Sequence, residues 1–113
     1  DIQCVMLTFK EDFGTQGRGG YFDKYGIIRD VLQNHLMQML TLLAMEPPST
    51  VQGPNAGKAI RDAKVAVLNA MPPITIDDCV LGQYEGYADD PTIENKATNT
   101  PTFAVIKLYV NTP

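Results

Sequence analysis

The sequence has few cationic side chains, and this scarcity excludes several classes of function. Its 113 residues hold nine Lys and Arg against thirteen Asp and Glu, so the net charge is -4 and the pI is near 4.7. Nucleic acid is therefore not expected as the main partner, because binding it requires cations that neutralise phosphates. A phosphorylated small molecule would need a local group of cations, and the first thirty residues contain four: Lys10, Arg18, Lys24 and Arg29.

Cysteine and long apolar runs are scarce as well. Cys4 and Cys79 are the only two cysteines, and their spacing does not match a metal site. We interpret them as reduced, buried thiols, which is typical of an intracellular protein, although a disulfide between them stays open. The chain has no apolar run of about eighteen residues and no secretory leader, so we expect no membrane segment.

The hydrophobic pattern predicts two helices and three strands. Strands are expected at residues 2–9, 78–84 and 102–110, and helices at about 25–46 and 57–70. This β-α-α-β-β order lacks βαβ alternation, which favours an α+β fold with a mainly antiparallel sheet. Asp23 is the expected N-cap of the first helix, and Pro47 and Pro48 end that helix.

Both ends of the sequence lie next to apolar strand patterns. Asp1 leads directly into the apolar run "IQCVMLTF", and the end "LYVNTP" follows another strand pattern. We therefore expect residues 1–113 to be a part of one domain from a longer chain. The length permits a hydrophobic core of moderate size.

The first predicted helix carries the only histidine of the chain. One face of this apolar helix is polar and has to meet water or a ligand; its members are Asp30, Asn34, Gln38 and Thr41. In an α-helix His35 would lie about 140° around the axis from Asp30, so the two could not form a hydrogen bond. A carboxylate that fixes the imidazole tautomer would then come from another segment.

Two interpretations of His35 stay open at this point. A neutral imidazole between apolar neighbours can act as a general base near pH 7. A core histidine that is hydrogen-bonded to a backbone carbonyl fits the same pattern, and composition alone favours it.

The other candidate residues are equally ambiguous. Asp30 is either a solvated residue favoured by the helix dipole or a ligand-binding carboxylate. Glu11, at the end of the first strand pattern, is either exposed without a role or able to reach ligand hydroxyls. The stretch "GTQGRGG" at 14–20 matches neither nucleotide-binding glycine motif, so a hinge or tight turn is expected there. Arg29 is as consistent with an ion pair as with a ligand contact.

Several segments, in order, resemble the substrate domain of glucose-6-phosphate dehydrogenase. They are "LTFKEDFGTQGRGGYFDKYGIIRDVLQNHLMQMLTLLAME", "IRDAKVAVL", "VLGQYEGYADDPT" and "TPTFAV". The likeness as a whole extends over essentially residues 2–110. The segment "GQYEGYADDPT" is most similar to enzymes of plant or algal type.

The resemblance implies an oxidation of glucose 6-phosphate to the 6-phosphogluconolactone, the first step of the pentose phosphate pathway, with NADP as hydride acceptor. It implies that His35, in "QNH", removes the proton of the C1 hydroxyl. It also implies that Asp30, in "IIRD", and Glu11, in "FKE", bind the sugar hydroxyls. Two carboxylates that accept hydroxyl protons and an imidazole that takes a proton suit this chemistry.

The resemblance also indicates what is missing from this sequence. The family's Gly-x-x-Gly-Asp-Leu-Ala turn of the Rossmann coenzyme domain has no counterpart, and neither does its Asp-His-Tyr-Leu-Gly-Lys segment, which orients the base and binds the phosphate. An incomplete fragment of this kind is expected to be inactive alone. It would work with the remainder of the enzyme, in a homo-oligomer, in the cytoplasm or alternatively the plastid. The competing interpretation is a non-catalytic structural or interaction subunit derived from this enzyme.

Overall fold

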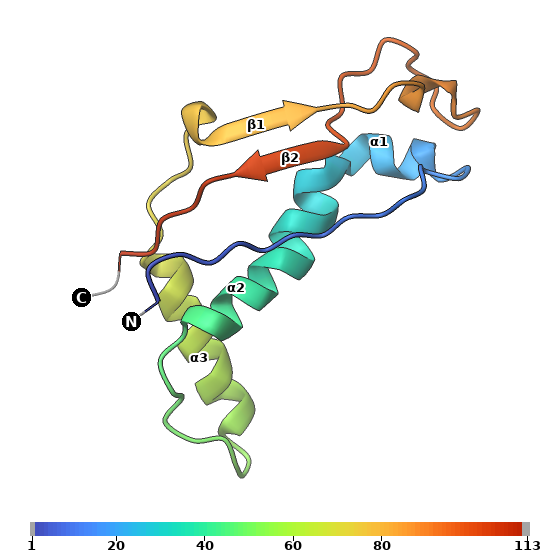
Figure 1. Cartoon of the computed structure of the whole chain (residues 1–113). Helices are drawn as coiled ribbons and strands as arrows, with labels where there is room; N and C mark the ends of the chain where they lie inside the picture. Colours follow the sequence, from blue (N-terminus) through green and yellow to red (C-terminus); the bar gives the residue numbers. More distant parts are fainter. Residues whose placement is uncertain (1, 112–113) are drawn as a thin grey trace.

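The structure is a computed structural model that describes residues 2–111, and it combines helices with a small antiparallel sheet (Figure 1). The principal elements are α1 (Gly19–Ile27), the π-helix η1 (Ile28–Leu36), α2 (Met37–Ala44), α3 (Ala56–Asn69), β1 (Cys79–Gly82) and β2 (Phe103–Ile106). Two short 3-10 turns, η2 (Ile76–Asp78) and η3 (Tyr87–Asp89), flank β1 along the chain. The predicted α+β class with antiparallel pairing is confirmed.

The sheet consists of β1 and β2, which pair with Cys79 opposite Ile106 and Gly82 opposite Phe103. The backbone N–H of Thr102 donates to the carbonyl of Gly82 at 2.9 Å, which continues the ladder beyond β2. Both strands lie inside the predicted ranges but are shorter. The sheet lies near α1, at one end of the helical column formed by η1 and α2 (Figure 1).

The predicted strand at residues 2–9 is wrong. Residues 2–10 form no strand, and side chains such as Ile2 and Met6 are 76% and 88% exposed. A strand requires a neighbour to satisfy its backbone groups, and no described strand pairs with this segment. The predicted burial of Cys4 is also wrong, because that thiol is exposed. Both cysteines are free, as predicted.

The first helix begins earlier than predicted and is not one continuous α-helix. It starts at Gly19, so Asp23 lies inside α1 and the predicted N-cap is wrong. Gly26 then interrupts the helix with φ 71° and ψ 170°, a conformation that is essentially restricted to glycine. The N–H of Ile27 donates to the carbonyl of Pro101 at 2.9 Å, which anchors this bend to the segment before β2.

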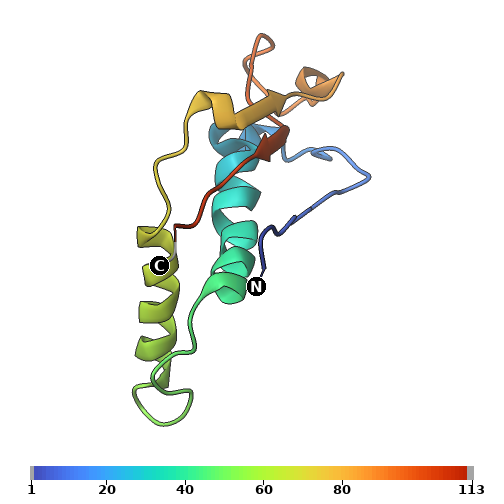
Figure 2. The same cartoon turned by 60° about the vertical axis from the view of Figure 1, so that its left-hand side comes forward.

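Helix α3 agrees with the prediction to within one residue and lies beside α2, as both views show (Figures 1 and 2). Thr41 of α2 and Val67 of α3 are buried at 3% and 4% exposure. Lys64 Nζ also donates to Gln38 Oε1 at 3.0 Å across the pair. This packing fixes the end of the helical column that follows η1.

The hydrophobic core is smaller than the sequence length permits. Val67, Tyr87 and Ile93 are the only buried apolar residues among those described. The molecule extends over 50 × 34 × 23 Å with a radius of gyration of 17.4 Å, whereas a compact domain of this length has about 13 Å. Much apolar surface therefore stays exposed. Within residues 2–111 no helix is long and apolar enough to span a bilayer.

Candidate functional site

The candidate residues His35 and Asp30 both lie on η1, a nine-residue π-helix. In a π-helix each N–H bonds to the carbonyl five residues before it. Such segments are rare in proteins, and many of those known lie at functional sites. The N–H of Met37 donates in this way to the carbonyl of Leu32. The imidazole is therefore carried by backbone of unusual geometry.

This geometry changes the angle between the two side chains. Residues five apart lie about 50° apart around a π-helix, since the i→i+5 pattern corresponds to about 4.4 residues per turn. An ideal π-helix would therefore bring Asp30 and His35 toward one face, whereas an ideal α-helix would separate them by about 140°. The structure shows no hydrogen bond between them within residues 2–111.

The His35 ring is exposed within the described part of the chain, so it is not a core histidine. The Phe9 ring lies beside it and nearly parallel to it, with 6.3 Å between the ring centroids and 20° between the planes. No hydrogen bond holds the imidazole within residues 2–111. The imidazole therefore has an aromatic neighbour but stays accessible to a ligand or another segment.

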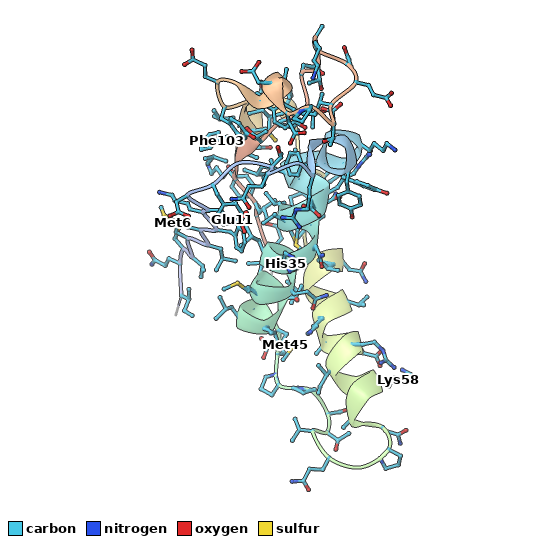
Figure 3. All side chains as sticks on the ribbon, turned by 90° about the vertical axis from the view of Figure 1, so that its right-hand side faces the viewer. Met6, Glu11, His35, Met45, Lys58 and Phe103 are labelled. Atoms are coloured by element: carbon cyan, nitrogen blue, oxygen red, sulfur yellow. The ribbon has the colours of Figure 1, made fainter. Side chains whose placement is uncertain are left out.

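Glu11 is brought to the same region by the N-terminal segment. It follows Phe9 by two residues, and Figure 3 shows it on the segment that passes the helix of His35. Glu11 is exposed and Asp30 is half-buried. Both carboxylates can accept hydrogen bonds from hydroxyl groups, and an imidazole can take a proton from one. The three predicted residues thus come from two segments that meet beside η1.

Sequence reasoning missed a hydrogen-bond network around Asp90. One carboxylate oxygen accepts from the Thr15 hydroxyl and from the backbone N–H groups of Gly17 at 3.1 Å and Gly19 at 3.2 Å. The other oxygen accepts from the N–H of Thr92 at 2.9 Å. The Thr15 hydrogen bond, with those from Thr92 and Gly19, holds the pKa of this carboxyl well below its usual value.

This Asp90 network explains the glycine-rich stretch at 14–20. The stretch is a tight turn, with φ of 50° at Gln16 and 82° at Gly17, as the glycine content predicts. An added Cβ at Gly19 would lie 2.7 Å from Asp90 and from Ile93, so only glycine fits there. The turn therefore has a structural role: it ties the start of α1 to the segment after η3.

A second network connects α1 to the segment before β2. Asp23 Oδ1 accepts from the hydroxyls of Thr98 at 2.6 Å and Tyr87 at 3.0 Å. The Thr98 hydrogen bond is the largest cause that lowers the pKa of Asp23. Burial, together with the bond to Asp23, raises the pKa of Tyr87. Sequence reasoning assigned Asp23 to capping because its partners lie far away in the chain.

The glycine-rich turn before α1 does not fit a dinucleotide cofactor. A pyrophosphate would bind to free N–H groups of a glycine turn at a helix N-terminus. At the start of α1 the N–H of Gly19 is bonded to the anionic Asp90, and that of Gly20 is bonded to Thr92 Oγ1 at 2.8 Å. NADP therefore has no place on this turn. Within residues 2–111 no group of three His, Cys, Asp or Glu could hold a metal ion.

Comparison with known proteins gives a consistent result. The family model described as "Glucose-6-phosphate dehydrogenase, C-terminal domain" matches residues 1–113. The glucose-6-phosphate 1-dehydrogenase of Ceratitis capitata is 54% identical over 122 residues, which cover 98% of this chain and 22% of the relative. The cytoplasmic isoform of Solanum tuberosum is 57% identical over 111 residues, or 98% of this chain and 21% of the relative.

Two solved structures agree with these relatives. A glucose-6-phosphate 1-dehydrogenase from Mycobacterium avium has a TM-score of 0.82 and 40% identity, over 90% of this chain and 21% of its own. A glucose-6-phosphate dehydrogenase in complex with its substrate glucose-6-phosphate has a TM-score of 0.79 and 46% identity, over 90% of this chain and 22% of its own. The chain thus spans about a fifth of the length of the proteins it matches.

Proposed function

The chain belongs to the glucose-6-phosphate dehydrogenase family, and on that basis we propose that residues 1–113 form part of the substrate-binding and catalytic domain of a longer enzyme. That enzyme oxidises glucose 6-phosphate to 6-phosphogluconolactone. The observation that carries the proposal is the position of His35: an exposed imidazole on a π-helix, with the segment of Phe9 and Glu11 beside it.

The proposed roles follow from the chemistry of each group. His35 takes the proton of the C1 hydroxyl while the C1 hydrogen leaves as hydride, so that C1 becomes the lactone carbonyl. Asp30 and Glu11 accept hydrogen bonds from other hydroxyls of the sugar and hold the ring in place. NADP, when bound by other parts of the enzyme, would accept the hydride that leaves C1.

The remainder of the enzyme is needed for this function. The glycine-rich turn at the start of α1 does not fit a dinucleotide, and the small core leaves apolar surface exposed. We propose that the rest of a longer chain, in a homo-oligomer, covers this surface, and that the isolated chain is inactive. The compartment proposed is the cytoplasm, with the plastid as alternative, because relatives are named as cytoplasmic and as chloroplastic isoforms.

The exposed apolar surface also favours a second candidate, a non-catalytic subunit that docks to a larger assembly. Val80, Phe103 and Val105 of the sheet are each more than half exposed. The intact mass of the natural polypeptide discriminates between the two. A chain that holds both family domains has a mass of about 55 to 60 kDa, and a docking subunit would have the 12.4 kDa of these residues.

The test requires a complete enzyme that carries these residues. We define the carrier enzyme as the Solanum tuberosum cytoplasmic isoform in which the matching 111-residue segment is replaced by that of this chain. We expect the carrier enzyme to reduce NADP with glucose 6-phosphate. The isolated 113-residue chain should give no turnover, and a rate near that of the carrier enzyme would refute this part.

The first prediction concerns His35 in the carrier enzyme. His35→Asn should lower kcat by about 10²- to 10⁴-fold and leave KM for glucose 6-phosphate nearly unchanged, because a general base acts in the transition state. Steady-state kinetics measure both values. As a control, Asn69→Asp at the exposed end of α3 should change neither value. Equal kcat for the His35→Asn variant and the unmodified carrier enzyme would contradict the assignment.

A further inference from the structure

The π-helix η1 is longer than such segments usually are. Its nine residues lie directly between α1 and α2, whereas π-helices mostly occur as single turns inside α-helices. A π-segment contains an additional residue relative to an α-helix of the same rise. Its hydrogen bonds and packing are less favourable, so a segment of this length calls for a reason in the structure around it.

Both ends of η1 are fixed by contacts with other elements. Before it, the bend at Gly26 is anchored by the hydrogen bond from Ile27 to Pro101. After it, α2 packs on α3 through the buried Thr41. The rotation between these two anchors is therefore set by the number of residues in η1 and by their helical type.

The helical type decides whether His35 and Asp30 face the same ligand. At a spacing of five positions, an ideal π-helix separates their directions by about 50°, and an α-helix would separate them by about 140°. The spacing suits the π-geometry and not the α-geometry. The N-terminal segment with Phe9 passes this side of the helix, so a ligand there meets residues from both segments.

We propose that η1 is a positioning element: its π-geometry turns His35 onto the face of Asp30, so that the base and a hydroxyl-binding carboxylate meet the same sugar. This inference rests on the function proposed above. The backbone of residues 28–36 then has a functional role, and the site should tolerate a deletion in η1 only if His35 and Asp30 stay on one face of the helix.

The first experiment measures the geometry without activity. Asp30→His in the carrier enzyme places a second imidazole five residues before His35. Two imidazoles on one helical face chelate a metal ion, so Ni²⁺ should bind at least about tenfold more tightly than to the double variant Asp30→His with His35→Asn. Equal Ni²⁺ affinity, measured by calorimetry, would mean that the two positions do not share a face and would overturn the proposal.

The second experiment changes the register with two deletions of one exposed residue each. Deletion of Gln33 lets η1 become α-helical with His35 four residues after Asp30, about 40° away. Deletion of Arg29 allows the same α-helix but keeps the spacing of five and therefore an angle of about 140°. Relative to Gln33→Ala, the first deletion should lower kcat/KM by less than about tenfold. Relative to Arg29→Ala, the second should lower it by about 100-fold or more.

The outcomes separate the inference from the function on which it rests. If the carrier enzyme has no turnover that depends on His35, the proposed function fails, and the Ni²⁺ result still reports the geometry. If turnover depends on His35 but the two deletions behave alike, the positioning role is wrong. Should the Arg29 deletion fail to fold, as judged by circular dichroism, the Ni²⁺ comparison alone decides between the two helical types.

Discussion

At the scale of single residues, Asp30 and His35 both lie on η1, but their substitutions are expected to change different kinetic constants. Asp30→Asn in the carrier enzyme removes a charged acceptor for a sugar hydroxyl, so KM should rise by about 10- to 100-fold, with a smaller change in kcat. Asp62→Asn is the matched control, because that exposed carboxylate contacts only Lys58 on α3. A fall in kcat at constant KM would contradict the binding role.

Asp90 is a residue whose role is structural, and its effect should depend on pH in a defined way. Asp90→Asn should lower the urea midpoint of the carrier enzyme, since the carboxylate accepts hydrogen bonds from Thr15, Gly17 and Gly19. Its neighbour Asp89, which is exposed, provides the control: Asp89→Asn should have little effect.

The pKa of Asp90 gives the sign of the pH effect. Hydrogen bonding lowers this pKa in the folded protein below the ordinary value of 3.8. The stabilisation is therefore complete above pH of about 4 and is lost only as the pH falls further. The difference in urea midpoint between the carrier enzyme and Asp90→Asn should be equal at pH 7 and pH 5. A difference that shrinks over this range would contradict the assignment to this carboxylate.

At the scale of elements, the bend between α1 and η1 depends on Gly26. Its φ of 71° and ψ of 170° are unfavourable for any residue with a Cβ, and that Cβ would lie 3.3 Å from Thr100 Cγ2. Gly26→Ala should therefore destabilise the fold by about 1 to 3 kcal/mol. It should also lower turnover, because the bend fixes the start of η1.

A matched glycine makes this prediction specific. Gly57 lies in α3, and an added Cβ there would meet only the end of the Arg61 side chain at 3.8 Å. Gly57→Ala should stabilise the helix by about 0.5 to 1 kcal/mol. Urea midpoints of the two variants should shift in opposite directions. A stabilising Gly26→Ala would show that the bend is not strained for other residues.

At the scale of the whole molecule, the sequence predicted local elements better than their connections. Hydrophobic periodicity predicted α3 to within one residue, and both strands of the structure lie inside the ranges that it predicted. Three partners of Asp90, namely Thr15, Gly17 and Gly19, lie 71 to 75 positions away in the chain, so no local pattern could reveal their part of the network. The predicted strand at 2–9 is wrong because a strand needs a neighbouring strand to pair with, and the sequence pattern of one segment does not show whether that neighbour is present. The π-helix η1 was not predicted because hydrophobic periodicity does not distinguish a π-helix from an α-helix.

The shape of the molecule leads to a last prediction, for the isolated chain. Apolar side chains such as Ile2, Met6 and Val105 are 76%, 88% and 56% exposed, and the buried apolar core contains only three described residues. Large apolar patches bind other apolar surfaces or dyes. The isolated 113-residue chain should therefore bind the dye ANS more strongly per residue than the carrier enzyme does, and it should self-associate in size-exclusion chromatography with light scattering. A monomer that unfolds cooperatively without binding the dye would show that these residues need no cover from other polypeptide, and the requirement for a longer chain would then rest on the missing coenzyme site alone.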